Sequence, residues 1–471
     1  MDSHLRLALA VLLATALAAA AAPAAHAAGP EVGVADDRLL FEGGADPDRV
    51  VAEWRAQGVD IVRMFALWSR IAPARRPPGF NGANQHAPGY EWGRLDQAIR
   101  RVRAAGLRVM LTVSGPGPVW TSRSPGRHNP RYRPDPAEYA DFATAVATRY
   151  GADVDRYILW NEPNLPSWLQ PQAACARRRC TPVAPHLYRG LVRAAYPAVK
   201  AADPGAEVLI GAMSSRGQRL RTRNSTLRPM IFLRALGCVS SGYRKLRTGD
   251  CRRFKPARAD GFAFHPHGTL TSPDRAYPNA DDVNLASLDR LESALDRLQR
   301  AGRLRASTRR FNLFLDEYGY QTRPPDRTAG VSLATQDRWL QKAAYRAWRD
   351  PRVRVLTQYQ WYDEPLRRAG SPFAGWQSGL RFVSGRPKPA LAHFATPMQV
   401  DGPRSRLWGQ ARPGDAQTVT VERRAKGARR YVAIARVRTD ARGYWTIKRR
   451  LTPGARYRFR TAAATSASFR R

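Results

Sequence analysis

Two glutamates follow strand-like apolar runs and are of a type that can share acid/base chemistry. Glu162 comes after the run 157–160, and Glu317 comes after the run 313–316. In a parallel barrel, the carboxyl ends of all strands meet at one mouth. One carboxyl group there can protonate a leaving oxygen while the other attacks carbon, as retaining cleavage of a glycosidic bond requires at a separation of about 5–5.5 Å. We therefore expect Glu162 and Glu317 to face each other across a barrel mouth.

The elements that must position these groups are indicated by an alternating pattern that starts near residue 31. Short apolar runs alternate with longer amphipathic segments, which is typical of β-α units on a parallel sheet. Helix starts are specified locally, for example by Asp46-Pro47 and Asp135-Pro136. The expected strands are 31–34, 59–65, 108–113, 156–161, 207–212, 261–265, 312–317 and 354–360. The predicted fold is α/β, a (β/α)₈ TIM barrel over residues 29–398.

After Pro397 the pattern changes to short runs of alternating residues separated by Gly, Asp and Pro. The expected strands are 418–421, 431–435, 444–447 and 457–459. Such a pattern predicts a small all-β sandwich domain, immunoglobulin-like or fibronectin-like, over residues 399–471. It contains no evident catalytic cluster, so we favour a structural or spacing role over carbohydrate binding.

Residues 1–28 have the pattern of a secretory signal peptide. His4 and Arg6 precede a run of Leu, Ala and Val that ends at Ala25-His26-Ala27, a small-x-small cleavage site. An uncleaved membrane anchor is the alternative. No later apolar stretch approaches the roughly 20 residues needed to cross a bilayer. We expect a secreted bacterial protein, extracellular or associated with the cell wall, without a membrane span after cleavage.

The four cysteines form two close pairs, Cys175 with Cys180 and Cys238 with Cys251. An exported chain meets oxidising conditions, so two local disulfides are expected, although four cysteines allow three connectivities. Neither pair has a CxxC spacing or histidines at ligand spacing. A zinc site is therefore not predicted.

The formal net charge of +40 raises the question of an anionic partner. The 78 basic residues are spread from end to end. We favour a broadly basic surface and expect no nucleic acid partner. A polyanion binder would instead need charge concentrated on one face with interleaved aromatic residues, and its affinity would depend on salt.

The motif Trp160-Asn161-Glu162-Pro163-Asn164 resembles the acid/base motif of clan A, the large clan of retaining (β/α)₈ glycosidases with cellulase-like, β-xylosidase-like and iduronidase-like families. The resemblance implies that Glu162 is the acid/base and that Asn161 hydrogen-bonds the sugar 2-hydroxyl. Glu317, in residues 316–319, is similar to the strand-seven nucleophile of the clan. Asp316 is the alternative nucleophile, but strand alternation predicts that it points the other way. The resemblance covers about residues 31–397 and implies no metal or organic cofactor.

Other strand ends agree with the same resemblance. Arg63 resembles the strand-two arginine that hydrogen-bonds near the nucleophile, with a buried ion-pair partner as the alternative. His265 and His267 follow strand six, where the clan often has a residue that touches the nucleophile. The two histidines also share a face that would suit a metal, but no convincing third ligand is evident. Trp361 follows strand eight, at a position similar to the tryptophan that forms the floor of the sugar site.

Several aromatic residues are further candidates for binding substrate. Tyr318 is adjacent to Glu317, and other candidates for sugar stacking are Trp68, Trp120, Trp168 and Trp376. Aromatic rings suit both sugar faces and protein cores, so packing explains each tryptophan equally well.

The sequence thus predicts a secreted retaining glycoside hydrolase that acts on a β-linked oligosaccharide or polysaccharide. The alternative is a non-catalytic extracellular barrel that binds glycan. Because both carboxylates are present, the enzyme is favoured, although fold similarity alone does not establish turnover. Sugar identity depends on the loops, which carry long insertions at 72–90 and 214–254, and water or a second sugar could be the acceptor.

Overall fold

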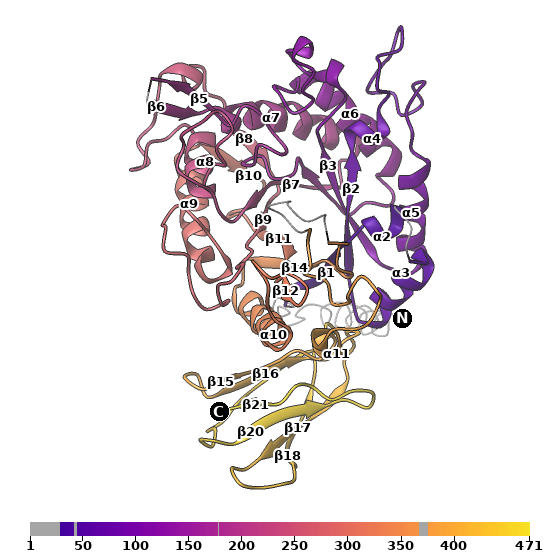
Figure 1. Ribbon diagram of the computed structural model, residues 1–471, viewed down its shortest axis with the longest axis vertical. Helices are drawn as coiled ribbons and strands as arrows, with labels where there is room; N and C mark the ends of the chain where they lie inside the picture. Colours follow the sequence, from indigo (N-terminus) through magenta and orange to yellow (C-terminus); the bar gives the residue numbers. More distant parts are fainter. Residues whose placement is uncertain (1–28, 42–44, 178, 367–374) are drawn as a thin grey trace, which may run out of the picture.

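A computed structural model describes residues 29–41, 45–177, 179–366 and 375–471; the predicted signal peptide lies outside this part of the chain. Eight parallel strands form a closed barrel in the order β1-β14-β11-β9-β7-β4-β3-β2 (Figure 1). The strands are β1 (Glu31–Ala35), β2 (Ile61–Leu67), β3 (Arg108–Ser114), β4 (Arg156–Leu159), β7 (Glu207–Ser214), β9 (Gly261–His265), β11 (Leu313–Tyr318) and β14 (Val353–Tyr359). The predicted barrel is confirmed, and β1 closes it by pairing with both β2 and β14.

Helices surround the barrel (Figure 1). The longer ones are α3 (Pro47–Ala56), α5 (Gly93–Ala104), α6 (Pro136–Tyr150), α7 (Ala184–Ala202), α8 (Pro229–Leu236), α9 (Leu288–Arg300) and α10 (Leu333–Arg349). The side chain of Asp46 accepts a hydrogen bond from Asp48 N, and Asp135 accepts one from Ala137 N, so both predicted caps form. Shorter helices are α2 (Arg38–Phe41), α4 (Trp68–Ile71) and α11 (Pro389–Phe394).

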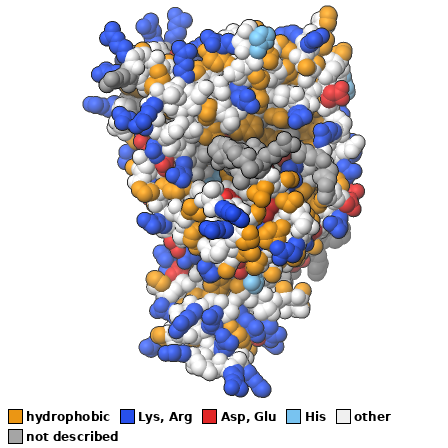
Figure 2. Space-filling model, in the orientation of Figure 1, with side chains coloured by type: hydrophobic (Ala, Val, Ile, Leu, Met, Phe, Trp, Pro, Cys, Tyr) orange, Lys and Arg blue, Asp and Glu red, His pale blue; other side chains and the backbone are white. Residues whose placement is uncertain are grey.

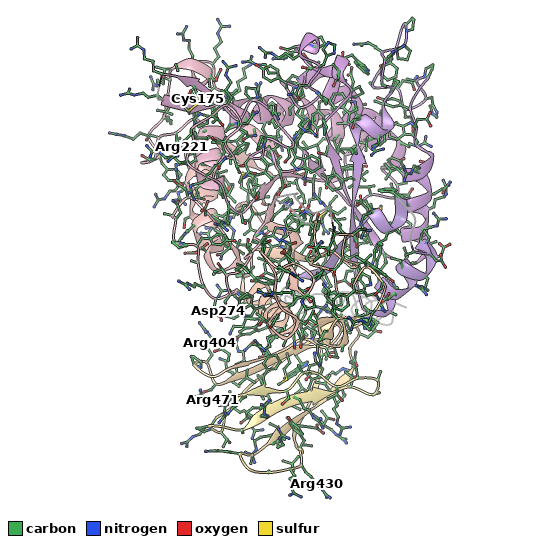
Figure 3. The ribbon with its side chains drawn as sticks, in the orientation of Figure 1. Cys175, Arg221, Asp274, Arg404, Arg430 and Arg471 are labelled. Carbon is green, nitrogen blue, oxygen red and sulfur yellow. A yellow bond between two sulfur atoms is a disulfide. The ribbon has the colours of Figure 1, made fainter. Side chains whose placement is uncertain are left out.

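The segments between the barrel strands carry small sheets and both disulfides. These sheets pair β5 (Ala173–Ala176) with β6 (Arg179–Pro182), β8 (Ala257–Ala259) with β10 (Leu304–Ala306), and β12 (Thr322–Arg323) with β13 (Val331–Ser332). Cys175–Cys180 joins β5 to β6, where Cys175 is labelled in Figure 3. Cys238–Cys251 closes the loop that precedes β8. Both predicted local pairings are confirmed.

The C-terminal region forms two antiparallel sheets. One contains β15 (Met398–Asp401), β16 (Arg406–Gln410) and β19 (Tyr444–Lys448). The other, in the order β18-β17-β20-β21, contains β17 (Thr418–Arg424), β18 (Val432–Arg438), β20 (Arg456–Arg460) and β21 (Phe469–Arg470). Val421, Trp445 and Phe459 are buried in the core that the two sheets share. The predicted β domain is confirmed, with β15, β16 and β21 in addition to the strands that the sequence indicated.

The C-terminal sheets pack against the end of the barrel where the strands begin. Trp408 and Tyr444 form an aromatic cluster with Tyr345 of α10. The Tyr444 hydroxyl donates to the Pro30 carbonyl at 2.8 Å, directly before β1. The β domain therefore lies beside the barrel, next to α10 and α11, and contacts it where β1 begins (Figure 1). Within the described residues, no helix is both long and apolar enough to span a membrane.

Candidate active site

Glu162 and Glu317 both approach the buried His265 ring. His265 Nδ1 lies 3.2 Å from Glu162 Oε1 and 3.5 Å from Glu317 Oε2. These two oxygens can therefore be no further apart than the sum of the two distances, which is compatible with the separation of about 5–5.5 Å between the carboxyl groups of retaining pairs. The side chains of Glu162 and Glu317 are 17% and 10% exposed, so both keep some access to solvent.

Arg63 of β2 links the nucleophile candidate to the loop after β4. Its Nη1 donates to Glu317 Oε1 at 2.5 Å, and its Nη2 donates to Asn161 Oδ1 at 2.6 Å. Arg63 and Asn161 are both buried. The planar guanidinium fixes two acceptors at once, which restricts the orientation of the Glu317 carboxylate.

Asp316 belongs to the same charge network, contrary to the expectation from strand alternation. Its Oδ2 lies 3.1 Å from His265 Nε2 and 3.4 Å from Arg63 Nη2. The register between β11 and β14 is irregular between Leu315 and Tyr318. Such irregularities redirect side chains, so two successive carboxylates can reach the same two cations.

These contacts set the protonation of the buried groups. Burial lowers the pKa of His265, but the negative charges of Glu317 and Asp316 outweigh it and raise that pKa to about 10. Burial likewise raises the pKa of Glu317, but the cations His265 and Arg63 outweigh it and lower the pKa to about 2. At neutral pH the site therefore holds an imidazolium beside an ionised Glu317.

His267 adds an aromatic wall to this side of the mouth. Its Nε2 lies 3.7 Å from Glu317 Oε2, and its ring stacks on Trp376 with a centroid separation of 5.8 Å. The ring of Tyr359 meets both His267 and Trp376 edge-on. Tyr318 stacks on His267 from within the core and is itself buried. Tyr318 therefore supports His267 and does not face a substrate, which corrects its assignment to substrate binding.

The structure also corrects the expectation that Trp361 forms the floor of the sugar site. Trp361 is 0% exposed and packs edge-on against Phe394. Strand β14 ends two residues earlier, at Tyr359, which is only partly buried. The pKa of Tyr359 is raised by burial and by the charges of Glu317 and Glu162, so its hydroxyl lies in their field. Sequence reasoning missed Tyr359, although an aromatic residue at the last strand position was visible.

The other tryptophan candidates differ in their surroundings. Trp68 is 1% exposed and stacks on Phe142 of α6, so it belongs to the core and offers no face to a sugar. Trp120 is partly buried, and its Nε1 donates to the Pro73 carbonyl at 2.9 Å. The ring of Trp168 lies parallel to Phe65, 5.8 Å away. Trp120 and Trp168 thus anchor loops at the carboxyl ends of β2, β3 and β4.

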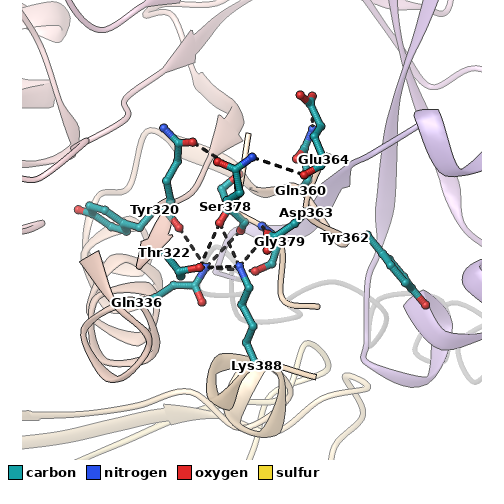
Figure 4. A network of polar contacts seen from close by, with 12 residues as sticks. Tyr320, Thr322, Gln336, Gln360, Tyr362, Asp363, Glu364, Ser378, Gly379 and Lys388 are labelled. Carbon is teal, nitrogen blue, oxygen red and sulfur yellow. Dashed lines mark hydrogen bonds and ion pairs between the residues drawn. The ribbon is translucent and has the colours of Figure 1, made fainter. Parts of the chain in front are cut away.

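A buried polar network holds the segment that carries Trp376 (Figure 4). Lys388 Nζ donates to Asp363 Oδ1 at 2.7 Å, to Thr322 Oγ1 at 2.8 Å and to the Gln377 carbonyl at 3.0 Å. These bonds tie residues on both sides of Trp376 to the loop after β11. The network therefore fixes the backbone next to the ring that stacks on His267.

The backbone around Glu162 is held in an uncommon conformation. Trp160 and Glu162 have φ values of 72° and 36°, in the left-handed region that residues other than glycine rarely adopt. Glu162 N donates to the Ala212 carbonyl at 2.9 Å, and Asn164 Nδ2 donates to the Leu227 carbonyl at 3.0 Å. Strain of this kind persists where surrounding contacts enforce it and clusters at functional sites.

Among the described residues, two groups of side chains have a spacing that could hold a metal ion. Glu317 supplies the third ligand that the sequence did not reveal beside His265 and His267. The raised pKa of His265 favours a protonated ring, so a metal ion at this position would have to displace that proton. The second group is His186, Cys238 and Cys251, in which the disulfide occupies both sulfur atoms.

Comparisons with known proteins show what the chain resembles. No family profile matches it. A family 39 glycoside hydrolase from the gut symbiont Bacteroides cellulosilyticus WH2 aligns with a TM-score of 0.55 and 14% identity, over 86% of this chain and 79% of that one. A glucosidase from Croceicoccus marinus aligns with a TM-score of 0.50 and 12% identity, over 91% and 94% of the two chains. These likenesses show a shared barrel fold.

One curated protein matches part of the sequence. The chloroplastic galactolipid galactosyltransferase SFR2 of Arabidopsis thaliana is 30% identical over 134 residues. This match covers 28% of the present chain and 20% of the plant protein, so the chain spans only a small part of that relative.

Proposed function

We propose that this protein is a retaining glycoside hydrolase in which Glu162 is the acid/base and Glu317 is the nucleophile. One observation carries the proposal: a single nitrogen of His265 lies within 3.5 Å of both carboxylates. That short spacing suits double displacement. The barrel fold, shared with a family 39 glycoside hydrolase and a glucosidase, supports the same activity.

The two glutamates differ in the way their roles require. Glu317 is ionised and oriented by Arg63, as a nucleophile must be. Glu162 has the more exposed side chain and no arginine partner among the described residues, which leaves it suited to exchange a proton with a leaving group or water. Asn161 accepts from Arg63 through Oδ1, so its Nδ2 can donate to a sugar hydroxyl.

The reaction proceeds in two displacements. In the first, a Glu317 oxygen bonds to the anomeric carbon, the glycosidic C–O bond breaks, and the leaving oxygen takes the proton of Glu162. In the second, Glu162 takes a proton from water, the water oxygen bonds to the anomeric carbon, and the ester to Glu317 breaks. The cations His265 and Arg63 keep Glu317 a carboxylate before each cycle.

We further propose that the protein is exported and that its substrate is a β-linked oligosaccharide or polysaccharide. The two local disulfides suit an oxidising compartment. The acceptor in the second displacement is proposed to be water. Transfer to a second sugar uses the same residues, and the plant relative is named as a galactosyltransferase.

The test begins with a panel of aryl β-glycosides and polysaccharides, followed by variants on a substrate that is cleaved. Glu317→Ala should abolish turnover on every glycoside, because no intermediate can form. Glu162→Ala should lose about 10²–10⁴-fold on poor leaving groups and keep part of the first step on activated aryl glycosides. Glu91→Ala, at an exposed glutamate, is the matched control.

Azide distinguishes the two roles by stereochemistry. In Glu162→Ala it should attack the glycosyl-enzyme and give a β-azide, whereas in Glu317→Ala it should attack the β-glycoside directly and give an α-azide. Wild-type rates in both variants would refute the assignment of the site. Tight glycan binding without cleavage of any substrate in the panel would favour a non-catalytic binding barrel instead.

A further inference from the structure

The C-terminal β domain carries far more positive charge for its size than the barrel. Residues 399–471 contain 17 Arg and 2 Lys but only 4 Asp and Glu, a net charge of +15 on 73 residues. The preceding 398 residues carry a net +25. In Figure 2 the lower end of the molecule, where this domain lies, shows Lys and Arg side chains with few acidic neighbours. The net positive charge per residue is thus higher in the β domain than in the rest of the chain.

Strand register gathers much of this charge on one face of a sheet. Along β20, Tyr457 and Phe459 point into the core, while Arg456, Arg458 and Arg460 alternate with them on the outer face. Arg436 of β18 lies opposite Thr420 of β17, and Thr420 lies opposite Arg460. Arginines of three neighbouring strands therefore share the outer face of the four-stranded sheet.

Three arginines lie in direct register across this sheet. Arg424 of β17 pairs with Arg456 of β20, and Arg456 pairs with Arg470 of β21. Like charges directly opposite one another destabilise a sheet. We call Arg424, Arg436, Arg438, Arg456, Arg458, Arg460 and Arg470 the arginine face. The mutual repulsion of Arg424, Arg456 and Arg470 destabilises the sheet, and an anion bound across the three side chains would reduce that repulsion.

The same row lines a surface hollow. The charged residues of this hollow are Arg424, Lys426, Arg429, Arg456 and Arg470, with no carboxylate among its lining residues. In the described part of the chain, none of these five cations forms an ion pair. Glu422 is the neighbouring carboxylate on this face, and it is already paired with Arg458 and Arg460 at 2.7 Å each.

We propose that the arginine face binds an anionic polysaccharide, with a carboxylate or sulfate group in the hollow. A guanidinium presents a planar fork that matches such groups in two parallel hydrogen bonds. From Arg456 to Arg460 the track extends about 13 Å along β20, since each strand residue rises about 3.3 Å. This length exceeds that of one small ion and suits a short stretch of a polymer.

The surroundings of Tyr431 favour a polysaccharide over single-stranded nucleic acid. Proteins that bind single strands stack bases on open aromatic rings. The Tyr431 ring is covered by Arg458 at 3.9 Å and approached by Arg424 at 5.2 Å, and its hydroxyl is bonded to Ser468. It therefore has little open face for a base, whereas Arg424 forms no ion pair in the described part of the chain and can meet an anionic group.

Binding at this face leaves the barrel mouth accessible. The β domain meets the barrel at Pro30, where β1 begins, whereas Glu162 and Glu317 lie at the opposite strand ends. Arg430 lies at the end of the β domain farthest from the barrel (Figure 3). The proposal does not depend on the proposed enzymatic activity, because it concerns retention on an anionic matrix.

The test measures the affinity of the full-length protein for immobilised polygalacturonate over a range of NaCl concentrations. The variant Arg424→Gln, Arg456→Gln and Arg470→Gln should bind at least about tenfold more weakly, and the slope of log K against log salt should fall by about two to three. The matched control Arg100→Gln, Arg300→Gln and Arg309→Gln removes three exposed barrel arginines and should stay within about twofold of wild type.

Further measurements control for misfolding of the variants and for the chemical class of the ligand. Thermal melting should show both triple variants folded, and Arg456→Lys should weaken binding less than Arg456→Gln, because it keeps the charge but loses the fork. Neutral dextran should not be retained. Equal binding by both triple variants would overturn the proposal. So would single-stranded or duplex DNA bound more tightly than polygalacturonate through the same residues.

Discussion

The barrel mouth and the arginine face both concentrate positive charge, but they balance it differently. In the mouth, the cations Arg63 and His265 each lie within 3.5 Å of carboxylates of the same chain. On the face, Arg424, Arg456 and Arg470 lie beside one another without a carboxylate in their hollow. Buried cations that pair with carboxylates of the same chain determine which of these groups are protonated. Exposed arginines without such partners can instead attract anions from solution.

The two settings also differ in their dielectric surroundings. The mouth cations are buried, so their interactions are strong and poorly screened by salt. The face is open to solvent, where each charge is screened and contributes little to stability. Replacing an arginine in the mouth should therefore lower stability strongly, whereas replacing one on the arginine face should weaken anion binding and change stability little.

The largest expected effect is the loss of stability when an arginine is removed from the barrel mouth, compared with the removal of one from the arginine face. Arg63→Met leaves Glu317 and Asp316 with His265 as their one remaining buried cation among the described residues and should lower the free energy of unfolding by about 3–5 kcal/mol. Arg456→Met should change it by less than about 0.5 kcal/mol, as is usual at exposed positions. Urea denaturation of both variants measures the difference. Similar losses from both substitutions would remove the distinction between the regions.

A second pair of variants tests whether a buried charge is costly because it lacks an ion-pair partner. Lys388→Met leaves Asp363 buried without its ion-pair partner and should also cost about 3–5 kcal/mol of unfolding free energy. The double variant Lys388→Met and Asp363→Leu should recover most of that loss, because neither buried charge remains. The measurement is again urea denaturation, and a double variant as unstable as the single one would contradict the explanation.

The raised pKa of His265 predicts how stability depends on pH. Because the folded pKa, about 10, exceeds the ordinary value of 6.5, the folded state holds this proton more tightly than the unfolded state. The resulting stabilisation is complete below pH 6.5 and is lost as pH rises toward 10. Relative to His265→Asn, wild type should lose up to about 1.4 kcal/mol per pH unit in this window.

Denaturation at several pH values tests that slope. The control is His128→Asn, which removes an exposed histidine and should keep the wild-type slope. A wild-type slope no steeper than that of His265→Asn would show that the charge network does not hold the proton.

The smallest expected effect is a gain in stability on the arginine face. Arg456→Gln removes the middle charge of the row formed with Arg424 and Arg470, so it should stabilise the protein by a few tenths of a kcal/mol at low salt. Near 1 M salt, where the Debye length is about 3 Å, the gain should disappear. Thermal melting at both salt concentrations provides the measurement.

The barrel was predictable because strands covered on both faces read as continuous apolar runs, as in residues 108–113. In the β domain, β15 and β16 escaped prediction because each is short and mixes polar with apolar residues. The individual roles of Glu162, Glu317 and Arg63 remain predictions, although the structure brings these residues together.

The error in the direction of Asp316 has a physical cause. Period-two alternation assigns directions only in a regular strand, and Asp316 lies where the register of β11 shifts. Trp361 lies beyond the end of β14, where alternation no longer applies, and Tyr359 takes the last strand position. The arginine face shows the same limit, because the charges can be counted in the sequence but only strand register shows which of them lie side by side.

The pairing of β1 with β14 has a consequence for the time at which the barrel can close. Residues 31–35 pair with residues 355–359, so the partner strand is synthesised more than 300 residues later. At about 5–20 residues per second, this interval lasts tens of seconds. Until then the unpaired edge of β1 exposes backbone donors and acceptors that can pair with other chains. Synthesis of β14 therefore limits how early the nascent chain can bury its first strand.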